Sequence, residues 1–348
     1  MRIRHVCRVA TPQVGGMESV VDGLVRWQRA HGHEVEVVSL EADRTLNDPV
    51  FVHRLPRMGS RRWPFARGLG DRLAGADVVH VHGVDGLLDQ VLRHRRRLNY
   101  RVGVSTHGGY FHTRWAWPVK QLWLRTGTRL TLGHCDGVWF TSVADQQRFA
   151  PAGRVGRVLV NGLNLSRWLS ASRRPEPGRL LVWGRLAAHK AVEDVIMGVV
   201  GQNVTLVVAG VVADEGYAQH LRRLAAEQGV QVLWRGALDQ DALEQELARA
   251  SCAIFPSRSE GFGLALVETM AAGVPVVARD IPAFRERLVH GETGWLTRDV
   301  EAALQQRAHL EVTERMAVAG RASVAAYDWS VRGPAFMRAY ADIQRTGR

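Results

Sequence analysis

The chain has 348 residues, of which 46% are hydrophobic and 23% charged, and it carries a formal net charge of +12. This composition is typical of a soluble globular protein, and the length suits two domains of about 150 residues each. No run of eighteen apolar residues occurs, which argues against a transmembrane helix. Cys7, Cys135 and Cys252 lack metal-binding spacing and lie in apolar runs, so we expect buried, reduced thiols.

The first residues, MRIRHVCRVATP, predict a buried strand and not a signal peptide, because they lack a long apolar core and a small-residue cleavage site. We therefore expect a cytoplasmic protein. Apolar strands then alternate with amphipathic stretches in two successive series, which predicts an α/β fold of two doubly wound, Rossmann-like parallel-sheet domains. The expected strands are residues 3–9, 34–40, 78–81, 102–105, 138–141 and 155–160, then 180–183, 204–209, 230–234, 253–255 and 275–278.

The predicted domains are residues 1–165 and 166–328. The polar stretch SASRRPEPGR, residues 170–179, contains two prolines and is interpreted as the interdomain connector. Residues 329–348 carry apolar side chains at helical spacing. Because ligands of doubly wound sheets bind outside the carboxyl ends of the strands, we expect a site in a cleft where the two domains face each other.

Candidate site residues follow three strands of the first domain. Gly15 and Gly16 come after the first strand and let the backbone approach a phosphate closely, although two glycines also fit an ordinary turn. Neither half has Gly-x-Gly-x-x-Gly or a Walker A sequence, so those modes of dinucleotide or ATP binding are not supported. His80 and His82 share one face of a strand end, and His107 follows the next strand. No third zinc ligand is evident near His80 and His82, so no metal is expected.

The positive charge is concentrated between residues 50 and 130, which contain fifteen basic and four acidic residues. Within WAWPVKQLWLRTGTRL, aromatic rings alternate with cations. This mixture suits the interface of an anionic bilayer, where rings lie among headgroups and arginines pair with phosphates. An ordinary solvated surface and a nucleic-acid surface are the alternatives, but no nucleic-acid-binding motif is present. The candidate acceptor or membrane residues are Trp115, Trp117, Lys120, Trp123 and Arg125.

In the second domain, Arg185 and Lys190 follow the strand at residues 180–183. The chain has 44 arginines and only two lysines, so Lys190 is not a generic surface cation. A compact ammonium suits a point contact with phosphate oxygens. We therefore expect this pair of cations to bind a phosphate group.

Asp239-Gln-Asp241 matches an Asp-x-Asp pattern that binds metal in some enzymes. It precedes the helix-forming sequence ALEQELARA, however, and we interpret Asp241 and Glu244 as a capping box. No metal is assigned to it.

The most informative segment is residues 257–278, SRSEGFGLALVETMAAGVPVVA, in which Glu260 and Glu268 lie eight residues apart around a Gly-Phe-Gly turn. The glycines let backbone amides approach phosphate oxygens, and the helix that follows directs its positive end to the same place. Glu260 then lies at the start of the helix and Glu268 about two turns along it. The residues of this segment that we expect to bind a phosphate-containing ligand are Phe262, Gly263, Leu264 and Glu268.

This segment resembles the Glu-x7-Glu motif of the retaining glycosyltransferases of family 4, which have the GT-B fold. The resemblance implies that Glu260 contacts the donor sugar, that Glu268 binds the ribose, and that Arg185 and Lys190 neutralise the diphosphate. The Thr-His-Gly context likewise implies a catalytic His107 in contact with the sugar. It further implies retention at the anomeric carbon, with a nucleoside diphosphate sugar as co-substrate and no metal or other cofactor.

Other positions correspond to the family pattern with two departures. Gly15 and Gly16 stand where the family has its glycine loop, and residues 329–348 would form the terminal helix that packs back on the first domain. Ala191 replaces the glycine that usually follows the lysine. Asn164 replaces the acid of an Asn-Gly-x-Asp signature.

The run THGGYFHT and the basic aromatic stretch after it resemble bacterial exopolysaccharide α-mannosyltransferases of the xanthan and acetan type. This resemblance implies GDP-mannose as donor and a polyprenyl diphosphate-linked oligosaccharide as acceptor. It places the protein on the inner face of the cytoplasmic membrane as a peripheral protein. A UDP-glucose-type donor, a soluble acceptor and a non-catalytic binding protein stay open as alternatives, and no nucleic-acid partner is expected.

Overall fold

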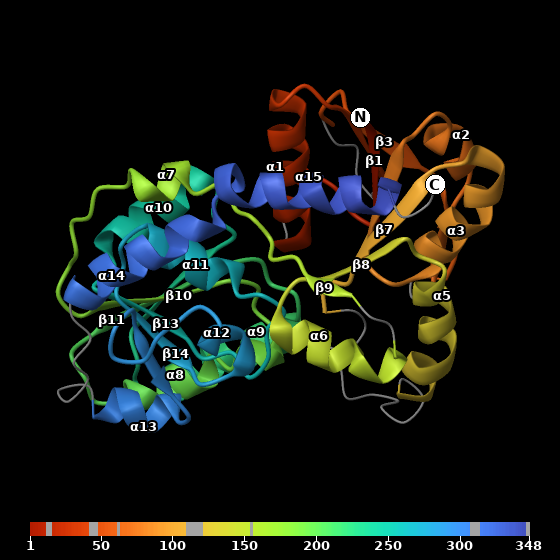
Figure 1. The fold of residues 1–348 in the computed structure, drawn as a ribbon. Helices are drawn as coiled ribbons and strands as arrows, with labels where there is room; N and C mark the ends of the chain where they lie inside the picture. The colour runs from red at the N-terminus through yellow and green to blue at the C-terminus, as the bar shows by residue number, and fades with distance from the viewer. Residues whose placement is uncertain are drawn as a thin grey trace. The chain divides into compact units, whose positions relative to one another are not determined.

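The chain folds into two compact units, each built around its own parallel sheet (Figure 1). The first unit contains Met1–Asn164 and Tyr327–Arg348, and the second contains Leu165–Ala326. The chain therefore passes between them at Asn164–Leu165, upstream of the proline-containing stretch that we interpreted as the connector. The computed structural model describes residues 1–11, 16–41, 48–60, 63–108, 121–153, 156–306 and 314–345.

The sheet of the first unit has the strand order β3-β2-β1-β6-β7-β8-β9 in the described part of the chain. The first strand, β1, lies between β2 and β6 and pairs with both in parallel. The winding direction of the sheet therefore reverses between β1 and β6. The strands are β1 (Arg2–Cys7), β2 (Glu34–Leu40), β3 (Val52–Leu55), β6 (Val78–His82), β7 (Arg101–Ser105), β8 (Gly137–Phe140) and β9 (Arg157–Val158).

Helices cover this sheet, and β4 (Arg57–Gly59) and β5 (Pro64–Ala66) form a separate antiparallel hairpin. Asp85 and Ser142 cap two of the helices by accepting hydrogen bonds from backbone amides of their first turns. The helical segments are α1 (Gly16–Ala30), α2 (Leu69–Leu73), α3 (Gly86–Leu98), the π-helical turn η1 (Leu124–Thr128), α5 (Arg129–Gly133), α6 (Val143–Phe149), η2 (Ala150–Ala152) and the C-terminal α15 (Trp329–Arg345).

The terminal helix α15 belongs to the first unit and packs on α1. The contact depends on glycines, because a Cβ on Gly333 would lie 2.3 Å from the Trp27 ring, and a Cβ on Gly23 would lie 2.1 Å from the Trp329 ring. Tyr340 of α15 is fully buried. The C-terminal segment therefore completes the core of the first unit.

The second unit repeats this plan with the order β12-β11-β10-β13-β14-β15 in its described residues. Its first strand, β10, pairs with β11 and with β13, so the winding reverses between β10 and β13. The strands are β10 (Arg179–Trp183), β11 (Thr205–Ala209), β12 (Val232–Gly236), β13 (Cys252–Phe255), β14 (Val276–Arg279) and β15 (Trp295–Thr297). The helices are α7 (Ser166–Leu169), η3 (Ala188–Lys190), α8 (Glu193–Gly198), α9 (Glu215–Glu227), α10 (Gln240–Arg249), α11 (Leu264–Ala271), α12 (Pro282–Arg285), α13 (Val300–Gln305) and α14 (Glu314–Val324).

The predicted α/β fold of two doubly wound parallel sheets is confirmed. One helix start was predicted wrongly. The cap of α10 is Asp239, whose side chain accepts from the Ala242 amide at 2.8 Å. Asp241 and Glu244 instead form ion pairs with Arg167. Within the described ranges, no helix is long and apolar enough to cross a membrane.

Candidate active site

The candidate residues of the second unit lie where β10 and β13 end side by side. The two strands pair in parallel at Leu180–Cys252, so the segments that follow them leave the same edge of the sheet. The Arg258 amide donates to the His189 carbonyl at 2.8 Å and holds these segments together. Residues far apart in the sequence therefore meet at the reversal point of the sheet, where doubly wound folds bind ligands.

Lys190 and Glu260 form an ion pair at this point. Lys190 Nζ donates to Glu260 Oε1, and Ser257 Oγ donates to the same oxygen at 2.9 Å. The side chains are only 18% and 16% exposed, so removing either partner would leave a partly buried charge without compensation. The structure thus brings together the predicted phosphate-binding lysine and the predicted sugar-binding glutamate.

Ala191, the departure from the family pattern, has a left-handed backbone with φ of 53° and is fully buried. This conformation is unfavourable for a residue with a Cβ, which explains why glycine suits the position. The turn after Lys190 is therefore kept despite the substitution, at a cost in backbone strain.

Arg185 follows β10 directly, and its side chain is exposed. It makes no hydrogen bond or ion pair with the described residues. The backbone before it is held closely, because a Cβ on Gly210 would lie 1.8 Å from the Gly184 carbonyl oxygen. A free guanidinium on a fixed stretch of backbone is available to bind an anion.

The N-terminus of α11 is shaped by Gly263, which caps the helix with φ of 85°. A Cβ there would lie 2.9 Å from the Phe284 ring, so both conformation and space require glycine. Phe262 is buried, and the Arg287 guanidinium lies 4.1 Å from the centre of its ring. Leu264 is the first residue of α11, whose backbone amides and dipole favour an anion at this end.

Glu268 lies further along α11 and is half-buried. Its carboxyl group makes no hydrogen bond or ion pair with the described residues. Burial raises the pKa of Glu268 to about 8, so the carboxyl is mostly protonated at neutral pH. The helix is fixed to β10 through Trp183, whose ring nitrogen donates to Thr269 Oγ1 at 2.7 Å. A hydroxyl group of a ligand can satisfy the carboxyl, which donates and accepts hydrogen bonds in its protonated form.

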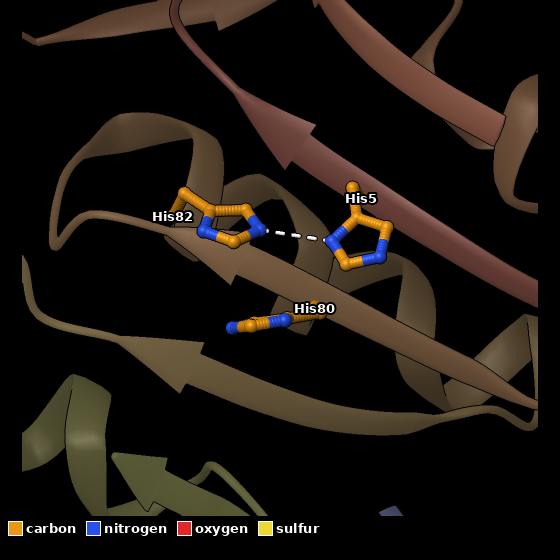
Figure 2. A group of neighbouring side chains, drawn as sticks. All are labelled: His5, His80 and His82. Carbon is orange, nitrogen blue, oxygen red and sulfur yellow. Dashed lines mark hydrogen bonds between the residues drawn. The ribbon is translucent and has the colours of Figure 1, made fainter. Parts of the chain in front are cut away.

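In the first unit, His5 of β1 joins His80 and His82 of β6 at the other reversal point (Figure 2). One ring nitrogen from each lies within 4.8 Å of the others. The expectation that a third ligand is missing was therefore wrong. The sequence does place a histidine, His5, in the first expected strand. Only the pairing of His5 with His80 in the sheet, however, shows that the rings lie close together.

The ring nitrogens of this group already have hydrogen-bond partners. His80 bonds to Tyr340 Oη at 2.7 Å and to Ser105 Oγ at 2.8 Å. Its ring lies against the ring of His82, with the centres 4.0 Å apart. Ligand lone pairs lie in the plane of an imidazole, so His80 directs neither nitrogen towards His5 and His82 in this arrangement.

His107 follows β7 with a left-handed backbone, φ 46°, which is uncommon for a residue with a Cβ. Its Nε2 lies 3.0 Å from His82 Nδ1. Burial lowers the pKa of His107 to about 4, with the Asp145 carboxylate acting weakly in the opposite direction. A strained backbone that carries a neutral imidazole is a combination found at functional sites.

Several predicted residues lie elsewhere. Gly16 is the first residue of α1, and Trp123 lies immediately before η1, 45% exposed and edge-on to Trp63. Arg125 is exposed on η1. Gly15, Trp115, Trp117 and Lys120 lie outside the described residues.

Comparison with known proteins now adds to this geometry. The model of Glycosyltransferase Family 4 matches residues 14–167, and that of Glycosyl transferases group 1 matches residues 170–315. A GDP-mannose:cellobiosyl-diphosphopolyprenol alpha-mannosyltransferase of Xanthomonas oryzae pv. oryzae is 33% identical over 94% of this chain and 93% of its own. The chain belongs to glycosyltransferase family 4. The predicted family is confirmed, and the protein is a glycosyltransferase.

Two further comparisons extend this result. An enzyme of Komagataeibacter xylinus with the same name is 29% identical to this family 4 chain, over 99% of this chain and 93% of its own. A sucrose-phosphate synthase structure from Thermosynechococcus elongatus superposes with a TM-score of 0.81 at 19% identity, covering 100% of both chains. The predicted GT-B fold is thereby confirmed.

Glu268 gives the first testable prediction. Its pKa in the folded protein, about 8, lies above the ordinary value of 4.5, so folding free energy is lost as the pH rises from about 4.5 towards 8. A Glu268→Gln side chain cannot ionise. The ligand-free variant should therefore be more stable than the unchanged protein at about pH 8.5, by on the order of 2 kcal/mol, and this gain should shrink towards pH 5.

Urea unfolding of the ligand-free protein at both pH values measures this difference. Glu292→Gln, which changes an exposed acid of the same unit, is the control and should show no such gain. A gain for Glu268→Gln that is equal at both pH values would contradict the assignment of the raised pKa.

Proposed function

We propose that this glycosyltransferase moves mannose from GDP-mannose to a polyprenyl diphosphate-linked oligosaccharide, with retention, in the synthesis of a bacterial exopolysaccharide or cell-surface glycan. The names and nearly full-length similarity of the two relatives support this donor and acceptor. The structural observation that carries the proposal is the ion pair of Lys190 with Glu260 where β10 and β13 end side by side, in the segments that follow these two strands.

The chemistry begins with the bond between the anomeric carbon and the diphosphate. When this bond breaks, positive charge develops on the sugar and negative charge on the β-phosphate, and preorganised cations stabilise the latter. Arg185 and Lys190 are the proposed cations, with the amides of Phe262 and Gly263 at the start of α11. We propose that no metal or other cofactor takes part, because these groups supply the neutralising charge.

The ion pair of Lys190 and Glu260 suggests how the donor diphosphate binds at Lys190. Glu260 compensates the Lys190 ammonium in the structure. We propose that the donor diphosphate takes over this role, which releases the Glu260 carboxylate to accept hydrogen bonds from the donor sugar. In this proposal Glu268 binds the ribose hydroxyls, the backbone amides of Gly15 and Gly16 contact the phosphates, and His107 orients a sugar hydroxyl.

Donor turnover is the main test. Purified protein is incubated with radiolabelled GDP-mannose, GDP-glucose, UDP-glucose or UDP-galactose, together with a lipid extract that contains polyprenyl diphosphate-linked oligosaccharide. We expect label in the lipid fraction from GDP-mannose only, since the guanosine and mannose contacts must both be satisfied. Transfer from a UDP-sugar in preference to GDP-mannose would overturn the donor assignment, and no transfer from any donor would overturn the enzymatic proposal.

The two glutamates should have separable effects. Glu268→Ala should weaken GDP affinity about tenfold, because it removes a ribose contact that is made equally in the ground state and the transition state. Glu260→Gln should leave GDP affinity within about threefold and lower kcat about 100-fold. Calorimetry with GDP and steady-state kinetics measure both, with Glu292→Gln as the control. Equal losses of affinity and turnover in the two variants would refute this division of roles.

We also propose that the basic first unit binds the surface of an anionic membrane, on the inner face of the cytoplasmic membrane. In support, the segment from Leu122 to Leu130 carries exposed apolar side chains next to cations. Leu122 is 65%, Trp123 45% and Leu130 67% exposed, and Arg125 and Arg129 lie between them in the sequence. Apolar side chains can enter the headgroup region while the arginines pair with lipid phosphates.

Co-sedimentation with vesicles of anionic and neutral lipids tests this surface. The double variant Trp123→Ser/Arg125→Ser should bind anionic vesicles at least about fivefold more weakly, because each basic residue near such a surface contributes about 1 kcal/mol. Val318→Ser removes an apolar side chain of the second unit that is even more exposed, and this variant should bind normally. Unchanged binding of the double variant would exclude this surface, and retention on oligonucleotides but not on vesicles would favour a nucleic-acid surface.

A further inference from the structure

A continuous row of hydrogen bonds runs through the buried histidines of the first unit to His107. Gln28 Oε1 lies 2.9 Å from His5 Nε2, and His5 Nδ1 lies 2.9 Å from His82 Nε2 (Figure 2). His82 Nδ1 lies 3.0 Å from His107 Nε2. Each of these hydrogen bonds joins either two ring nitrogens or a ring nitrogen and an amide oxygen. In each bond, one atom must carry the hydrogen and donate it, and the other must accept it.

The direction of the row is set at Gln28, which is fully buried on α1. Its Nε2 lies 3.9 Å from Met337 Sδ and 3.4 Å from Tyr340 Oη. A thioether sulfur can accept a hydrogen bond but cannot donate one, so the amide NH₂ faces Met337 and the amide oxygen faces His5. The reverse orientation would place the amide oxygen against the sulfur, with two acceptors facing each other.

This orientation determines every hydrogen in the row. The amide oxygen of Gln28 only accepts, so His5 Nε2 must donate. A neutral imidazole carries one hydrogen, so His5 Nδ1 accepts from His82 Nε2, and His82 Nδ1 in turn accepts from His107 Nε2. Burial keeps the rings neutral, since the pKa of His5 and of His107 falls to about 4 and that of His82 lies well below its usual range.

We propose that Gln28, acting through His5 and His82, fixes His107 as the tautomer with hydrogen on Nε2, so that Nδ1 meets the substrate as a hydrogen-bond acceptor. The proposal rests on the proposed function, in which His107 contacts the donor sugar. Nδ1 makes no hydrogen bond with the described residues. A sugar hydroxyl can donate to it, whereas a phosphate oxygen, which only accepts, is disfavoured.

Gln28, His5 and His82 are therefore positioning residues. They lie inside the unit and act on the substrate only through His107. The row also keeps positive charge away from the sugar, because a neutral acceptor beside a developing oxocarbenium ion is favourable and an imidazolium would not be.

A second branch from Gln28 accounts for His80. The amide NH₂ donates to Tyr340 Oη, which then donates to His80 Nδ1, and His80 Nε2 donates to Ser105 Oγ. The nitrogens of His5, His80 and His82 are thus all used in directed hydrogen bonds. A metal bound to these nitrogens would have to break hydrogen bonds in both branches. Metal binding is therefore the competing outcome, and the NMR experiment below also detects it.

Long-range ¹H–¹⁵N correlation spectra of the ¹⁵N-histidine-labelled full-length protein report which ring nitrogen carries hydrogen. His107→Asn assigns the His107 signals, because asparagine tolerates the left-handed backbone. At neutral pH and without donor, we expect His107 Nε2 protonated and Nδ1 unprotonated. A protonated Nδ1, an equal mixture of tautomers, or a joint shift of the His5, His80 and His82 nitrogens with near-stoichiometric Zn²⁺ would overturn the proposal.

Two variants separate positioning from general stability. Gln28→Met keeps the length of the side chain but removes the amide oxygen, so the tautomer of His107 should become mixed. The kcat for mannosyl transfer should fall about tenfold, which corresponds to the loss of about one hydrogen bond. Tyr340→Phe removes only the second branch and should leave the His107 tautomer unchanged. A Gln28→Met protein with an unaltered tautomer would contradict the proposal.

The spectra and the kinetics also distinguish this proposal from the proposed function. The spectra need no donor. If His107 shows the expected tautomer but the protein has no transfer activity, the proposed function is refuted and the proposed tautomer stands. If the protein has transfer activity but His107 carries its hydrogen on Nδ1, the proposed tautomer is refuted and the proposed function stands.

Discussion

The central position of the first strand in each parallel sheet is the constraint on which both candidate sites depend. Since β1 and β10 each have neighbours on both sides, the winding reverses next to them, and the chain segments that follow diverge at the carboxyl ends of the strands. In the second unit this place holds Lys190 and Glu260. In the first unit it holds His5 and the histidines of β6. The same topological feature thus organises charge in one unit and neutral hydrogen bonds in the other.

The candidate site of the second unit carries several unfavourable features at once. Ala191 has a left-handed backbone, a partly buried ammonium depends on one carboxylate, and burial raises the pKa of Glu268 so that its carboxyl holds a proton. Such features cost stability and are retained where a ligand or a reaction benefits from them. Environment also separates the two glutamates of the Glu-x7-Glu segment, since Glu260 has a cationic partner and Glu268 has none among the described residues.

The sequence was sufficient to predict the central strands, and insufficient where contacts between distant segments decide the structure. The central strands are continuous apolar runs because they are buried on both faces, whereas the edge strands β3 and β15 are half-buried and were missed. His5 escaped notice because only its register with His80 shows the contact. The cap at Asp239 depends on a local hydrogen bond that the residue pattern did not reveal. The roles of Trp115 and Trp117 stay predictions.

A crystal structure of the protein with GDP bound would show whether a nucleoside diphosphate occupies the reversal point between β10 and β13. We expect the diphosphate against Arg185 and Lys190, the ribose hydroxyls at Glu268, and Lys190 Nζ moved from Glu260 to a phosphate oxygen. GDP bound elsewhere, with the Lys190–Glu260 ion pair unchanged, would contradict this expectation.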